Sequence, residues 1–166
     1  MILGMSTATF TLLHVLISLV GIGSGFVVIF GLIAGKRLEV WTKLFLASTV
    51  LTSLTGFLFP IKGVTPGIVV GVLSLIVLAI AIIARYSRHM SGAWGWIYIV
   101  TTALALYFNT FVLVVQSFEK VAALKALAPT QKEPPFLVAQ VAVLILFIVL
   151  TAMSLKRFHG ESAAIV

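Results

Sequence analysis

Five long apolar runs dominate the pattern of the chain, and short segments between them hold most of the charged residues. A membrane-spanning helix needs about 20 predominantly apolar residues, and each run is close to that length. Pro60, Pro66 and Pro135 stand at three of the boundaries, where proline is expected because it ends or begins helices. The pattern predicts a single domain, residues 1–166, with transmembrane helices over residues 10–34, 41–59, 67–84, 94–118 and 136–155.

The composition indicates that lipid is the solvent of this chain. Of its 166 residues, 61% are hydrophobic and only 9% are charged, whereas a soluble domain usually carries about 25% charged residues. We therefore expect an all-α, polytopic integral membrane helix bundle. The absence of cysteine excludes thiol–disulfide chemistry and Fe–S ligation.

Lysine and arginine predict the orientation of the bundle. They cluster at the ends of apolar runs, and they form no basic face interleaved with aromatics, so the net charge of +7 does not indicate a nucleic-acid partner. The positive-inside rule puts the N-terminus outside and the C-terminus in the cytoplasm, with residues 119–135 as an outer loop. The bases of the cytoplasmic side are Lys36, Arg37, Lys43, Arg85, Arg88, Lys156 and Arg157, and those of the outer side are Lys62, Lys120, Lys125 and Lys132.

A polar stripe marks the fourth predicted helix, where Thr102, Asn109 and Gln116 recur at steps of seven. Residues seven apart return to nearly the same helix face, about 20° off, and lipid cannot satisfy an amide. In the predicted orientation, other polar side chains of the outer half converge with this stripe, which predicts a pocket open to the outside. The candidate ligand-binding residues are His14, Thr52, Ser53, Thr55, Asn109, Gln116 and Gln140, and the candidate lid residues are Gln131 and Glu133.

Each of these residues also has a purely structural explanation. His14 could bond to a hydroxyl or to a backbone carbonyl, and the two amides of the stripe could hold helices together. The hydroxyl groups of the second helix could bond back to their own helix, and Glu133 could be a solvated loop charge. The Gly21-x-x-x-Gly25 pair predicts a close approach between helix backbones.

Three phrases of the chain resemble those in an uncharacterised family of small five-helix bacterial inner-membrane proteins. They read LFLASTVLTSLTGFLFP, GAWGWIYIVTTALALYFNTFVLVVQ and LAPTQKEPPFLVAQ. The resemblance covers most of the chain and implies a multi-pass protein of the bacterial inner membrane. It implies no activity.

The leading functional hypothesis is a non-enzymatic module that binds or transports a small, partly apolar molecule. No cofactor is predicted, although a quinone-like or lipid-like ligand suits an apolar cavity with a few fixed polar groups. The alternative is an accessory subunit or homo-oligomer building block, whose partners are the lipid bilayer and itself or other membrane subunits. The third reading is a small membrane enzyme using His14 and Glu133. It ranks last because few residues of a usual catalytic constellation are present, and neither catalytic nor metal-binding residues are assigned.

Overall fold

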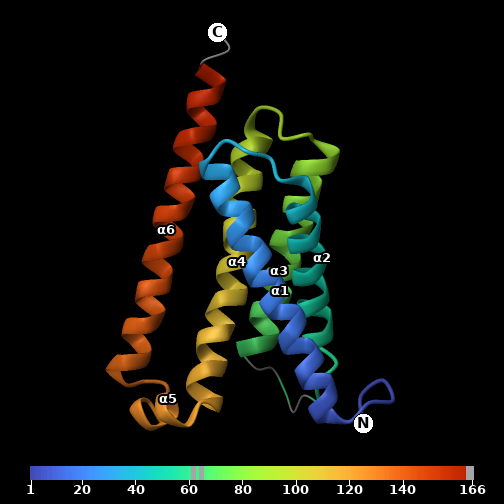
Figure 1. Ribbon diagram of the computed structural model, residues 1–166, viewed down its shortest axis with the longest axis vertical. Helices are drawn as coiled ribbons and strands as arrows, with labels where there is room; N and C mark the ends of the chain where they lie inside the picture. The colour runs from blue at the N-terminus through green and yellow to red at the C-terminus, as the bar shows by residue number, and fades with distance from the viewer. Residues whose placement is uncertain (61–62, 64–65, 164–166) are drawn as a thin grey trace.

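The computed structural model describes residues 1–60, 63 and 66–163, and over these residues the protein is helical, without a β-strand. These residues form five long helices and one short helix, and a π-helical turn, η1, extends the third long helix (Figure 1). The elements are α1 (Thr7–Ile33), α2 (Glu39–Gly56), α3 (Pro66–Ile82), η1 (Ile83–Ser87), α4 (Ala93–Lys120), α5 (Ala122–Leu127) and α6 (Pro134–Ala163).

The long helices alternate in direction, so the two termini lie at opposite ends of the bundle (Figure 1). The N-terminus and α5 lie at one end, called here the α5 end. The α1–α2 connection, η1 and the C-terminus lie at the other, called the η1 end. Helix α4 is central and contacts α1, α3 and α6, while α1 packs most extensively against α2.

Four of the helices are long and apolar enough to cross a membrane, and they suggest a multi-pass membrane protein. They are Thr7–Ile33, Pro66–Ser87, Ala93–Lys120 and Pro134–Phe158. Helix α2 is not among them, because its 18 residues include Glu39, Lys43 and six Ser or Thr residues, which make it less apolar than the other long helices. Large apolar side chains such as Ile76 and Ile148 remain exposed on α3 and α6, as expected for contact with lipid.

Local signals in the sequence explain where the helices begin and end. The Ser6 hydroxyl accepts a hydrogen bond from the Thr9 backbone N–H at 3.1 Å and so caps the start of α1. Pro66 and Pro134 occupy the first positions of α3 and α6, where a missing N–H costs nothing. Gly35, with φ of +71°, ends α1 in the left-handed conformation that glycine adopts most readily.

Three details differ from the prediction. The connector 119–135, predicted as an outer loop, contains α5, and the fifth predicted helix runs past residue 155 to Ala163. The third predicted helix does not end at residue 84, because η1 continues it to Ser87 and places Arg85 inside a helical turn, with its side chain buried. Lys62, counted with the bases of the outer side, lies outside the described residues.

Candidate functional site

Helices α1, α2 and α4 meet at Gly21, which lies between polar side chains of its two neighbours. A Cβ atom at Gly21 would lie 3.1 Å from Thr49 Oγ1, 3.2 Å from Asn109 Nδ2 and 3.3 Å from Ser48 Oγ. Only a residue without a side chain leaves these groups in place. We call Ser18, Gly21, Ser48, Thr49 and Asn109 the junction. The helices thus pack closely at Gly21, although side chains and not a backbone lie against it.

Asn109 and Thr49 of the junction are buried and incompletely bonded. Asn109 is 8% exposed, and its Nδ2 donates a long hydrogen bond of 3.5 Å to the Ser18 carbonyl. Thr49 is 1% exposed, and its Oγ1 has no hydrogen-bond partner in the described part of the chain. Thr102, two turns from Asn109, is likewise buried with an unpartnered Oγ1. Of these three side chains, only that of Asn109 bonds across helices, from α4 to α1.

His14 lies nearer the α5 end, where it links α1 to the end of α2. Its Nδ1 lies 2.8 Å from Thr55 Oγ1, and its ring meets Phe59 edge-on with centroids 5.3 Å apart. The structure thus brings together two of the predicted ligand-binding residues, His14 and Thr55. It also shows the contact with a hydroxyl that a structural role for His14 requires.

The hydroxyl groups of α2 bond mainly to their own helix. Thr52 donates to the Ser48 carbonyl at 2.9 Å, Ser53 to the Thr49 carbonyl at 3.1 Å, and Thr55 to the Leu51 carbonyl at 2.7 Å. Each bond spans four residues, the usual way in which Ser and Thr are satisfied inside a membrane helix. For these residues the geometry matches the structural explanation given above.

The other two amides of the predicted pocket, Gln116 of α4 and Gln140 of α6, have partners away from Asn109. Gln116 is exposed, and its Nε2 donates to Glu119 on the helix surface at 3.4 Å. Gln140 of α6 donates to the Phe111 carbonyl at 3.4 Å, while its Oε1 is buried without a hydrogen-bond partner among the described residues. The structure therefore does not bring Gln116 or Gln140 into the junction around Asn109.

Both predicted lid residues are held within the connector before α6. Gln131, with φ of +58°, donates to the Val115 carbonyl of α4 at 3.0 Å. The Glu133 carboxylate accepts hydrogen bonds from the Thr130 hydroxyl at 2.9 Å and from the Lys132 backbone N–H at 3.1 Å. Desolvation by itself would raise the pKa of Glu133, but these hydrogen bonds lower the pKa below its ordinary value. Glu133 and His14 thus have separate hydrogen-bond partners.

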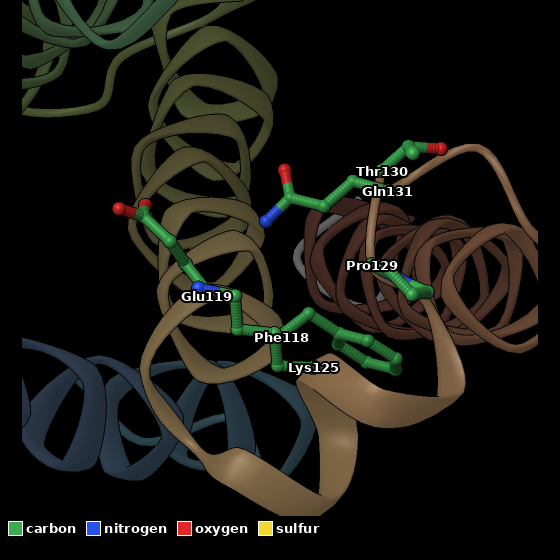
Figure 2. A pocket seen from close by; sticks show the side chains of 6 residues that line it. All are labelled: Phe118, Glu119, Lys125, Pro129, Thr130 and Gln131. Carbon is green, nitrogen blue, oxygen red and sulfur yellow. The ribbon is translucent and has the colours of Figure 1, made fainter.

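The connector borders an open hollow of about 290 Å³ at the α5 end, which we call the loop hollow. Phe118 is 7% exposed and meets Phe136 edge-on, with centroids 5.4 Å apart. In Figure 2 the Gln131 side chain points from the connector toward α4. The loop hollow is lined by Phe118, Glu119, Lys125, Pro129, Thr130 and Gln131. Of the predicted site residues, only Gln131 lines it.

A buried arginine at the η1 end is the main polar feature that the sequence analysis missed. Arg85 is 8% exposed, and its Nη2 lies 2.6 Å from Glu39 Oε2 of α2. Its Nη1 donates to Met90 Sδ at 3.5 Å, and its guanidinium carbon lies 5.3 Å from the centroid of the fully buried Tyr98 ring. The chain has few acidic residues that could pair with a buried base, but no sequence pattern indicates which of the eleven Lys and Arg residues is the buried one.

Comparisons with protein families, with curated proteins and with solved structures find no match to this chain. The function must therefore be inferred from the geometry of the junction, of the loop hollow and of the η1 end.

Proposed function

We propose that the protein spans the bacterial inner membrane five times, with its N-terminus outside, and binds a small, partly apolar molecule on the outer side. The packing of α2 supports the fifth crossing, because α2 lies against α1 and α3. Four of its hydroxyl-bearing residues satisfy themselves on its own carbonyls, which lowers the cost of placing them in lipid. The distribution of Lys and Arg supports the orientation.

The loop hollow is the observation that carries the binding function. Its volume of about 290 Å³ lies at the lower end of the range for small-molecule pockets. Phe118 supplies an apolar wall, while Glu119 and Lys125 supply opposite charges. This mainly polar lining suits the polar or charged group of a ligand, while Phe118 and Pro129 offer a smaller apolar surface to the body of a quinone-like or lipid-like molecule.

Replacing Lys125 by alanine should weaken ligand retention about tenfold, since a hydrogen bond to a charged group contributes about 1.5–3 kcal/mol. The measurement is native mass spectrometry of protein extracted in a mild detergent, with the bound small molecule released and weighed. Lys132→Ala is the matched control, because it removes the same charge from the same connector outside the hollow. Equal loss in both variants would contradict the assignment to the hollow.

An Asn109→Leu variant separates the loop hollow from the junction in the same measurement. If the loop hollow is the binding site, this variant keeps the ligand that Lys125→Ala loses. Loss of the ligand in Asn109→Leu alone, with unchanged folded yield, would favour the interior pocket of His14, Asn109 and Gln140 and would overturn the assignment to the loop hollow.

Single cysteines test the orientation directly, because the natural chain has none. Ala126 in α5 and Ser87 in η1 are both exposed, and they lie at opposite ends of the bundle. A membrane-impermeant maleimide added to intact cells should label Ala126→Cys and spare Ser87→Cys. The reverse labelling would place the loop hollow in the cytoplasm and would refute binding from the outer side.

The other two readings rank below this proposal. The exposed apolar faces of α3 and α6 suit lipid as well as another subunit, and an acid–base pair would need His14 and Glu133 to leave their present partners.

A further inference from the structure

A second, smaller recess lies at the η1 end, where the α1–α2 connection meets the last turns of α6 (Figure 1). Lys36 and Arg37 border it from the connection, and Arg157 borders it from α6. Met90 and Phe158 supply apolar walls, and no acidic residue lines it among the residues whose side chains the structure describes. We call this the basic recess. Three bases drawn from two separate elements thus surround one small opening.

The size of the basic recess limits what can enter it. Its volume is about 20 Å³, little more than the 10–15 Å³ or so that a single water needs. A phosphate oxygen fits this space, while the rest of a phosphodiester must stay outside the protein. The recess therefore suits a phosphate group at the end of a larger molecule better than an enclosed solute.

The surroundings of the recess indicate which larger molecule this is. Val149 and Met153 of α6 are exposed on the side of the helix that carries Arg157, within about two turns of Ser154, another lining residue. Apolar surface for acyl chains therefore adjoins a basic site for a headgroup. Bases close to a membrane surface attract anionic lipids with about 1 kcal/mol each. Charge and apolar surface together match an anionic phospholipid.

We propose that the basic recess binds the phosphate of an anionic phospholipid in the leaflet that faces the η1 end. This site is separate from the loop hollow, and it rests on the proposed membrane insertion and not on the ligand of the hollow. Lys36 and Arg37 hold the phosphate from the α1–α2 connection, Arg157 approaches it from α6, and the acyl chains lie along α6. The bound lipid then links α6 to the α1–α2 connection.

Native mass spectrometry of the purified protein in a neutral detergent tests this site with phosphatidylglycerol and phosphatidylcholine. We expect the protein to retain phosphatidylglycerol at least about tenfold better than the zwitterionic lipid. The double variant Lys36→Ala/Arg37→Ala should weaken phosphatidylglycerol binding about 30-fold, since it removes two attractive charges. The matched control, Lys120→Ala/Lys132→Ala, removes two charges at the α5 end that line neither the loop hollow nor the basic recess, and it should leave this binding unchanged.

Three results would overturn the proposal. Equal weakening in both double variants would mean that phosphatidylglycerol responds only to net charge. Unchanged binding in Lys36→Ala/Arg37→Ala would mean that the recess is not the site. Displacement of phosphatidylglycerol by a large excess of inorganic phosphate would mean that the recess takes free phosphate and does not recognise the lipid. Thermal unfolding of each variant shows whether it is folded, and a variant that is not folded is replaced by the corresponding glutamine double variant.

Discussion

Replacing Gly25 by leucine should destabilise the bundle by about 3 kcal/mol, the upper end of the usual cost of overpacking a core. A Cβ atom at this position would lie 2.6 Å from Leu106 Cδ1 and 2.8 Å from Phe45 Cδ2. Both neighbours are fully buried, so neither can swing into lipid to make room. The added side chain must therefore push α1 away from α2 and α4.

Gly23 gives the matched control on the same helix. No atom lies within 4 Å of a Cβ built there, so Gly23→Leu adds the same side chain toward open space. Thermal unfolding in detergent, followed by circular dichroism, should show a clear loss of stability for Gly25→Leu and little change for Gly23→Leu. An equal loss in the two variants would show that glycine serves helix flexibility here and not close packing.

Replacing Glu39 by glutamine should cost about 2 kcal/mol, because it leaves the buried guanidinium of Arg85 without a countercharge. Removing one partner of a buried pair typically costs about 3–5 kcal/mol, and the half-exposed Glu39 lets water compensate part of this. The second variant, Glu39→Gln/Arg85→Met, also removes the charge and should recover stability relative to the single variant. A double variant less stable than Glu39→Gln would contradict this account.

The same ion pair predicts an acid-sensitive stability. The hydrogen bond from Arg85 is the main cause that lowers the pKa of Glu39 below its ordinary value of 4.5. The folded protein therefore takes up this proton less readily than the unfolded chain does. The pair stabilises the fold above pH 4.5, and that contribution is lost as the pH falls through the lower folded-state pKa. Unfolding measured from neutral pH downward should show this loss in the wild type and not in Glu39→Gln.

The sequence was a good guide to the helices, because apolar length and proline act locally. Each of the five predicted runs contains a long helix, and Pro66 and Pro134 stand at the start of α3 and α6. The Gly21 approach was also predictable, since small residues one turn apart permit close packing. The short helix α5 escaped prediction because six residues carry almost no periodic signal.

The site was less predictable, because polar side chains can find partners on their own helix or far along the chain. The stripe on α4 placed Asn109 and Gln116 on one face, yet only Asn109 is buried, because Gln116 lies near the end of the helix beside Glu119. Arg85 was counted as a loop base, and its burial depends on Glu39, which lies 46 residues earlier in the chain.

The self-bonded hydroxyl groups of α2 have a consequence for how the chain enters the membrane during synthesis. Helix α2 is the one long helix that does not qualify as a span by itself, and only residues 34–38 separate it from the strongly apolar α1. Because backbone carbonyls of α2 accept hydrogen bonds from its own hydroxyl groups and its polar face lies against α1, we expect α2 to insert together with α1, as the second arm of a helical hairpin. A chain that lacks α1 would then leave α2 on the cytoplasmic surface of the membrane. Helix α3 would enter from that side, and every later helix would run in the reverse direction.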